Sequence, residues 1–342
     1  MASLLGEVCG DHYSLSNSEF PEISEEIGKT RQIKGMMKLP QFPFSGEFSM
    51  RFSSMRLTIL VSLCFGVPHH CSFVQMVEAA AVEPLKVLIV AGGCCHDYAT
   101  QTKLLKKGIE ERINASVEVI YNPDTSTEAR FDIYESDGWA RDFDVVIHDE
   151  CSANVSERPY VDRILNAHRN GVPAVNLHCA MHSYRWGNFQ EPVADGADNS
   201  GWYEMIGLQS SRHGPQSPID VTYSDHVIAE GLSAWKTVNE ELYNNVRVYD
   251  SAHIVASGRQ MQMPRKKKNK PVNPDVKPTE VEAVVAWTNE FGTKKTRIFS
   301  TSLGHNNDTV GDDKYLALIC RGILWSTHKL TDSGEPVVGY SK

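Results

Sequence analysis

From about residue 84, short apolar runs alternate with segments of helical spacing. Residues 86–91 (KVLIVA) form an uninterrupted apolar run, as expected of a strand buried on both faces. Apolar residues then recur three and four positions apart in 98–112, which predicts a helix. Strands that alternate with helices pair in parallel and form a doubly wound sheet with helices on both faces. On this basis we expect strands at 86–91, 117–121, 145–148 and 172–177 and helices at 98–112 and 160–169.

The back half of the chain is richer in strand patterns. Residues 281–288 and 296–301 predict a C-terminal β-hairpin around the Asn-Glu-Phe-Gly sequence at 289–292, and 313–325 predicts a closing helix. The basic segment 264–278 reads as a solvated loop. Further strands are expected at 219–223, 242–249 and 253–256. The predicted fold class is therefore α/β, with a mainly parallel sheet and a C-terminal β-hairpin.

The first 81 residues differ from the rest. Residues 1–54 show no sustained period and predict a disordered or mis-assigned extension. A basic start, the apolar run 57–67 and the small residues 79–81 predict a signal peptide at 55–81, with translation starting at Met50 or Met55. The alternative is a buried helix after a genuine N-terminal domain. Under the signal hypothesis the protein is exported, periplasmic or extracellular, and one domain at 84–329 precedes a flexible tail at 330–342.

Composition narrows the class of protein. With 41% hydrophobic and 23% charged residues, the chain is neither wholly disordered nor a multi-span membrane protein, and the apolar run 57–67 is too short for a span. A net charge of −9 argues against a nucleic-acid partner. Five cysteines would remain after signal cleavage, with their pairing open, although neighbouring Cys94 and Cys95 are expected not to bridge each other. These five are Cys94, Cys95, Cys151, Cys179 and Cys320.

Histidines follow several of the predicted strands. Ligands of a doubly wound sheet bind beyond the carboxyl ends of its strands, and histidine exchanges protons near neutral pH. A polar cleft at this edge is therefore expected, although a hydrogen-bonded structural role is the alternative for each histidine taken singly. Gly92-Gly93 lacks the spacing of a dinucleotide-binding loop, so a nicotinamide cofactor has no support. The strand-end histidines are His96, His148, His178, His182 and His305.

Five stretches in order along the chain carry a family resemblance. They are VLIVAGGCCHDY ending at Tyr98, PAVNLHCAMHSYRW (173–186), MIGLQSSRHGP (205–215), EGLSAWKTVNEELY (230–243) and VVAWTNEFGTKKTRIFSTSLGHN (284–306). Together they resemble the trehalose-utilisation ThuA-like family of the class I glutamine amidotransferase-like superfamily. The resemblance implies a flavodoxin-like fold and a role in disaccharide or keto-sugar catabolism. It also implies a cleft lined by His96, Asp97, His178, His213, Glu240, Glu241 and His305.

The leading hypothesis is a sugar-transforming enzyme that uses histidine and carboxylate acid–base chemistry. We expect His178 and His96 to transfer protons, Asp97 to orient His96, and Glu241 to act as a second base. A divalent metal such as zinc could be held by His96, His178 and His213, although no cofactor is firmly implied. The carbohydrate is the expected partner, and a homo-oligomer is left open. Substrate-binding residues would be His148, His182, Glu240, His213, His305 and Trp186.

Two other classes of function remain open at this point. The first is a non-catalytic carbohydrate-binding or sensing module. The second is an amidotransferase-like cysteine hydrolase that uses Cys179, which lies beside two histidines just after a predicted strand. Because the superfamily's Cys-His-Glu triad is broken here, glutamine hydrolysis is not expected.

Overall fold

The computed structural model of the protein describes residues 82–263 and 277–342. The expected extension at 1–54, the expected signal peptide at 55–81 and most of the basic loop 264–278 lie outside the described residues. Within the described part, no helix combines the length and the apolar character that crossing a membrane requires.

A nine-stranded sheet in the order β2-β1-β3-β4-β11-β10-β9-β6-β7 forms the centre of the domain. Its first five strands are parallel, and their order along the sheet is that of flavodoxin-like folds. The predicted α/β, flavodoxin-like class is confirmed. The parallel strands are β1 (Leu85–Gly93), β2 (Ala115–Asn122), β3 (Val145–Cys151), β4 (Ala174–Leu177) and β11 (Thr296–Thr301).

The back half of the chain extends this sheet with antiparallel strands. The predicted hairpin is present as β10 and β11. The predicted strand at 242–249 is wrong, because β7 already ends at Tyr243 and the chain turns before β8. The added strands are β10 (Thr279–Phe291), β9 (His253–Gln262), β6 (His213–Tyr223) and β7 (Trp235–Tyr243), and β5 (Leu208–Gln209) pairs separately with β8 (Arg247–Val248).

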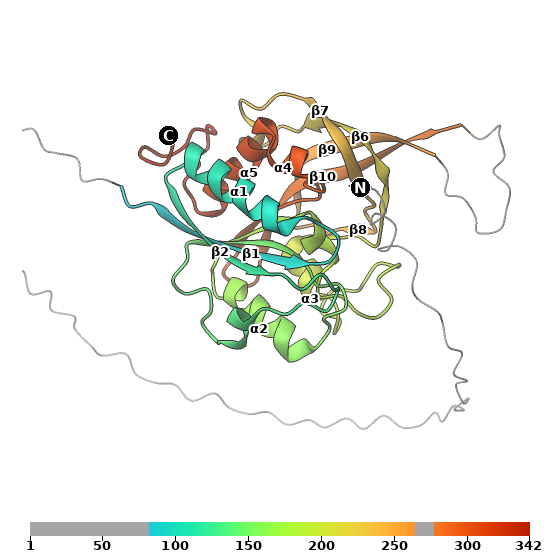
Figure 1. Ribbon diagram of the computed structural model, residues 1–342, viewed down its shortest axis with the longest axis horizontal. Coiled ribbons are helices and arrows are strands. Elements are labelled where there is room, and N and C mark those ends of the chain that lie inside the picture. Colours follow the sequence, from blue (N-terminus) through green and yellow to red (C-terminus); the bar gives the residue numbers. More distant parts are fainter. Residues whose placement is uncertain (1–81, 264–276) are drawn as a thin grey trace, which may run out of the picture. The chain divides into compact units, whose positions relative to one another are not determined.

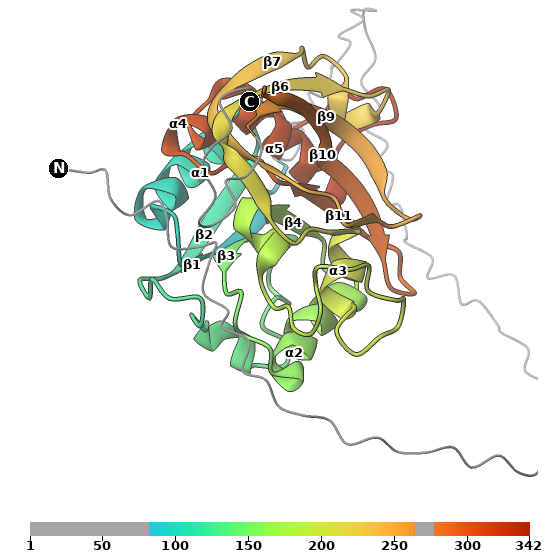
Figure 2. The ribbon, with the colours of Figure 1, turned by 90° about the vertical axis from the view of Figure 1, so that its right-hand side faces the viewer.

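Helices cover both faces of the sheet, as the alternating pattern predicts (Figures 1 and 2). Successive residues of β1 point to opposite faces, so Val87 and Ile89 join one hydrophobic core and Leu88 and Val90 join the other. The first core lies under α1 (Tyr98–Arg112), α4 (Asn307–Val310) and α5 (Asp313–Ser326), and the second lies under α2 (Arg158–Arg169) and α3 (Gly201–Ile206). Short 3-10 helices are η1 (Asp132–Glu135), η2 (His178–His182) and η3 (Val227–Ala229).

The last residues of the chain are held to the domain. Ser341 forms an isolated bridge with Ile113, just beyond α1. The backbone N–H of Asn114 donates to the Tyr340 carbonyl at 3.0 Å, and the Lys342 N–H donates to the Arg112 carbonyl at 3.1 Å. The expectation of a flexible tail at 330–342 is thus not met, because these backbone groups pair with the end of α1.

Candidate functional site

The site is built where the carboxyl ends of β1, β4 and β11 meet β7. The loop after β1 carries His96 and requires glycine, because Gly92 and Gly93 have φ values of 146° and 92°. A Cβ on Gly93 would also lie 2.3 Å from the carbonyl oxygen of Cys151 in β3. These glycines let the loop pass close to β3 and direct His96 toward the residues that follow β4 and β11.

Glu241 is the centre of the site. Its carboxylate Oε2 lies 3.6 Å from His178 Nε2, 3.4 Å from His213 Nδ1 and 3.3 Å from His305 Nδ1. Burial alone would raise the pKa of Glu241, but hydrogen bonds to His178 and His305 and the neighbouring positive charge hold it well below its usual range. Glu241 is therefore ionised at neutral pH. The structure brings these four predicted residues together.

His178 begins η2 with a φ of 38°, an unusual conformation for a residue with a side chain. Its Nδ1–H donates to the Ser302 carbonyl at 2.6 Å, and its Nε2 faces Glu241 and the Tyr243 hydroxyl at 3.4 Å. Burial would lower the pKa of His178, but the hydrogen bond to Glu241 and the nearby negative charges raise it to about 9. His178 is thus a buried imidazolium at neutral pH.

Gln216 fixes the orientation of His305. Its amide nitrogen lies 2.7 Å from His305 Nε2 and 3.3 Å from Glu241 Oε1. An amide N–H can donate to each, so His305 Nε2 is the acceptor and Nδ1 carries the proton toward Glu241. His213 and His305 are more exposed than Glu241 and His178, with 30% and 14% of their side chains accessible against 8% and 2%. A molecule that approaches from solvent would therefore meet His213 and His305 first.

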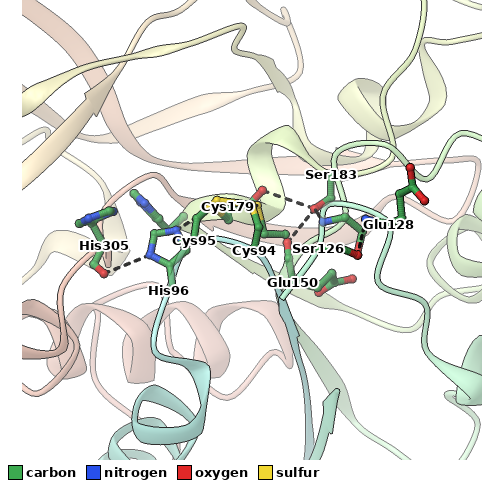
Figure 3. The surroundings of a disulfide bond; sticks show 12 residues. Cys94, Cys95, His96, Ser126, Glu128, Glu150, Cys179, Ser183 and His305 are labelled. Atoms are coloured by element: carbon green, nitrogen blue, oxygen red, sulfur yellow. Dashed lines mark hydrogen bonds between the residues drawn. A yellow bond between two sulfur atoms is a disulfide. The ribbon is translucent and has the colours of Figure 1, made fainter. Parts of the chain in front are cut away.

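His96 and Cys179 form a second pair beside this cluster (Figure 3). His96 Nε2 lies 2.9 Å from Cys179 Sγ, and His96 Nδ1 lies 3.2 Å from the carbonyl oxygen of His305. A hydrogen bond from the Cys151 thiol holds the pKa of Cys179 well below its usual range, and the charge of His96 adds to this against the effect of burial. Burial would lower the pKa of His96, but the charge of Cys179, the hydrogen bond to Cys179 and the charge of Glu241 together raise it. The pair therefore favours thiolate and imidazolium.

Two predicted carboxylates have structural roles instead. Asp97 is exposed and caps α1, with Oδ1 accepting from the Thr100 N–H at 3.2 Å and Oδ2 accepting from the Asn307 side chain at 2.9 Å. It does not orient His96. Glu240 is fully buried, and its oxygens accept from the backbone N–H groups of His305 and Asn306 at 3.1 and 3.3 Å. Glu240 thus positions the loop that carries His305, and its expected role in substrate binding stays a prediction.

His148 is not in the cleft. It is fully buried, with Nδ1 2.9 Å from Glu150 Oε1 and Nε2 2.9 Å from His168 Nε2. The Tyr134 and Tyr184 hydroxyls also donate to Glu150 Oε1, at 3.0 and 3.1 Å. Burial, aided by His148, lowers the pKa of His168 to about 3. The His148 side chain thus belongs to a buried hydrogen-bond network with Glu150 and His168, and its expected role in substrate binding stays a prediction.

His182 and Trp186 lie behind or beside the cluster. The ring of His182 stacks on Tyr243 with centroids 4.5 Å apart, and its Nε2 lies 2.9 Å from the Ser210 hydroxyl. Burial and neighbouring positive charges hold the pKa of His182 well below its usual value, so it stays neutral. The indole N–H of Trp186 donates to Asp198 at 3.3 Å. In the part of the chain that the structure describes, neither residue forms a hydrogen bond or ion pair with Glu241.

Within the described residues, two side-chain groups are compact enough to hold a metal ion. The nitrogens of His96, His178 and His305 lie within 4.8 Å of one another, so His305 replaces the predicted His213 in a metal-capable trio. The other group is Cys94, Cys95 and Cys151. Contrary to expectation, Cys94 and Cys95 are joined by a disulfide, with Cα atoms 3.7 Å apart.

Sequence reasoning missed Tyr243 and Gln216. Tyr243 was placed in a wrongly predicted strand, whereas β7 puts Glu241 and Tyr243 on the same face because they are two residues apart. Gln216 pairs with Glu241 across β6 and β7.

Two depressions on the surface of the described residues lie away from the Glu241 cluster. One is near Lys294 and His328, the other is near Tyr249, and neither includes a residue of the Glu241 cluster.

The comparisons with known proteins identify the family of the chain. Residues 86–326 match the ThuA family, described as trehalose utilisation, so the chain belongs to the ThuA family. A putative ThuA-like protein from Parabacteroides merdae is 17% identical, with 76% of this chain and 97% of that one covered and a TM-score of 0.47. One from Bacteroides uniformis is 16% identical, with 75% and 97% covered and a TM-score of 0.49. No curated protein matched the chain.

Proposed function

We propose that this ThuA-family protein is an enzyme that transforms a disaccharide or keto-sugar derivative by proton transfer at the Glu241 cluster. The observation that carries the proposal is the contact of one buried carboxylate with three histidines, at 3.3 to 3.6 Å. Titratable groups whose surroundings push their pKa values apart are typical of acid–base sites. The family's description, trehalose utilisation, supports a carbohydrate as the substrate class.

His178 is the proposed proton donor. Its pKa of about 9 keeps it charged at neutral pH, and its Nε2 is directed at Glu241 and Tyr243 rather than at a backbone carbonyl. A glycosidic or carbonyl oxygen that gains negative charge during the reaction could accept this proton. Glu241 would hold the imidazolium in place until the transfer occurs.

His305 and His213 are the proposed substrate-facing groups. Both contact the Glu241 carboxylate and both are partly exposed. A proton taken from a sugar carbon or hydroxyl by the His213 imidazole would leave a second imidazolium beside Glu241, whose negative charge would stabilise it, while His305 would hold the substrate. His96 then completes the cluster by contacting the His178 and His305 rings, with centroids 4.8 and 4.7 Å away.

The test is turnover of a panel of ordinary and oxidised disaccharides by the full chain, with products identified by mass spectrometry. Glu241→Gln should lower the rate by about 10²- to 10⁴-fold, the usual range for loss of acid–base catalysis. The matched control is Glu118→Gln, which removes an exposed carboxylate on β2 and should leave the rate unchanged. Equal rates for wild type and Glu241→Gln would refute the proposal, and sugar binding without any product would support the binding-module alternative.

A cysteine hydrolase is the second candidate, because Cys179 Sγ and His96 Nε2 are only 2.9 Å apart. Against it, Cys179 is 5% exposed, and the residue in the strained turn conformation is His178. The same assay with amides, including glutamine, separates the two candidates. Cys179→Ser should leave sugar turnover largely intact under the first proposal and abolish amide hydrolysis under the second.

A further inference from the structure

A group of cysteine sulfurs lies next to the Glu241 cluster without taking part in it. Cys94 and Cys95 form a disulfide at the end of β1, and Cys151 ends β3 beside them. The sulfurs of these three residues lie within 4.8 Å of one another. Cys151 in turn hydrogen-bonds Cys179, which contacts His96. Neighbouring sulfur atoms therefore connect the loop after β1 with the pair of His96 and Cys179.

The backbone fixes the approach of Cys94 to Cys151. Gly93 and Cys151 are register partners in the parallel pairing of β1 with β3, and the Cys94 N–H donates to the Cys151 carbonyl at 3.4 Å. The close passage depends on Gly93, where any side chain would collide with that same carbonyl. As a result, Cys94 Sγ and Cys151 Sγ are 3.3 Å apart, both buried.

The side chain of Cys95 is exposed, whereas those of Cys94 and Cys151 are buried. A disulfide with one buried and one exposed sulfur, and a third sulfur in contact with the buried one, has the arrangement that thiol–disulfide exchange requires. The third sulfur can attack the buried atom while the exposed sulfur leaves toward solvent.

We propose that Cys94, Cys95 and Cys151 form a thiol–disulfide exchange site that opens to low-molecular-weight disulfides through Cys95. In the internal step, the Cys151 thiol passes its proton to the hydrogen-bonded Cys179 sulfur, and the Cys151 thiolate attacks Cys94 Sγ. The Cys94–Cys95 bond breaks, its electron pair stays on Cys95 as a thiolate, and a Cys94–Cys151 disulfide forms. No oxidant is consumed, because one disulfide replaces another.

The external step uses the released thiolate. Cys95 attacks a low-molecular-weight disulfide R–S–S–R, forms a mixed disulfide with one R–S group and releases the other as R–S⁻. The protein thereby gains a modification on the residue directly before His96. This chemistry needs neither Glu241 nor a sugar, so it stands or falls independently of the proposed function.

The experiment treats the full chain with oxidised glutathione at neutral pH, blocks remaining thiols by alkylation, and maps tryptic peptides without reduction. Cleavage after Lys86, Lys103, Arg141 and Arg163 places Cys94 and Cys95 in peptide 87–103 and Cys151 in peptide 142–163. In wild type we expect these peptides to be cross-linked and peptide 87–103 to carry glutathione. The matched control Cys320→Ser removes a buried thiol in α5 and should behave as wild type.

Two variants make the result decisive. Cys151→Ser removes the attacking sulfur, so glutathione on peptide 87–103 should fall about tenfold or more. Cys95→Ser leaves Cys94 facing Cys151, and the two peptides should be cross-linked by a Cys94–Cys151 disulfide after mild oxidation. The proposal is overturned by unmodified peptide 87–103 in wild type, by equal modification in Cys151→Ser, or by alkylation of both Cys94 and Cys151 in oxidised Cys95→Ser.

Discussion

Replacing Glu241 by glutamine should lower the pKa of His178 by about 2 to 3 units. The His178 Nε2 and Glu241 Oε2 atoms are 3.6 Å apart, and at an effective dielectric constant of about 20 two unit charges at that distance interact by about 4.6 kcal/mol. Since one pKa unit corresponds to about 1.36 kcal/mol, the upper limit of the shift is about 3 units. The pKa of His178 should therefore fall from about 9 to the region of 6 to 7.

The assay is NMR titration of the full chain with ¹³C-labelled histidine side chains. The chain has 13 histidines, so the His178 resonance is identified by its loss in His178→Gln. Treatment with a chelator beforehand ensures that no metal competes with the proton for the imidazole nitrogen. Glu118→Gln is again the control and should leave the His178 pKa at the wild-type value.

A change below about 0.5 unit in Glu241→Gln would refute the reasoning, because it would be smaller than a contact ion pair of this kind can produce. It would mean that Glu241 and His178 are not paired in solution, or that His178 is neutral in the folded protein. Either result would remove the proton donor from the proposed mechanism.

Three further predictions concern stability, each measured as the free energy of unfolding in urea. Between about pH 6.5 and 9 the raised pKa of His178 makes this free energy fall by up to about 3 kcal/mol, whereas the lowered pKa of Cys179 makes it rise over the same range. In Cys179→Ser only the effect of His178 remains, so the free energy should fall as pH rises, and a flat profile in this variant would contradict the buried imidazolium. Gly93→Ala should lower the free energy of unfolding by several kcal/mol, because the new Cβ would lie 2.3 Å from the Cys151 carbonyl oxygen. The control Gly196→Ala has no heavy atom within 4 Å of the new Cβ and should lower it by only about 1 kcal/mol, because of the positive φ at that position. Glu150→Leu should lower it by about 1 to 3 kcal/mol, because the Tyr184 hydroxyl and the hydrogen-bonded pair of Tyr134 and His148 lose their common carboxylate, and a neutral effect would show that these hydrogen bonds do not stabilise the fold.

The order of strands and helices could be predicted because its signals are local. An uninterrupted apolar run, helical spacing and a glycine turn are each contained within about ten residues, as at 86–91 and 98–112. The convergence of His96, His178 and His305 followed from the rule that parallel strands place their carboxyl ends at one edge.

The structure differs from the sequence-based expectations where the direction of a side chain, and not its position along the chain, decides what the side chain contacts. His148 comes at the end of a predicted strand, as His178 does, yet it lies in β3 and its side chain enters the buried hydrogen-bond network with Glu150. Asp97 directly follows His96 in the sequence, as a residue that orients His96 could, but in the structure its side chain caps the N-terminus of α1. The Cys94–Cys95 disulfide is accompanied by a positive φ of 85° at Cys95, and no pattern of residues in the sequence predicts that backbone conformation.

The most direct test of the central claim is a crystal structure of the Glu241→Gln full chain with the sugar that the wild type transforms. The account predicts density for the sugar against His213 and His305, with an oxygen within hydrogen-bond distance of His178 Nε2. Sugar bound elsewhere, for example in the depression near Lys294 and His328, with the Glu241 cluster empty, would contradict it.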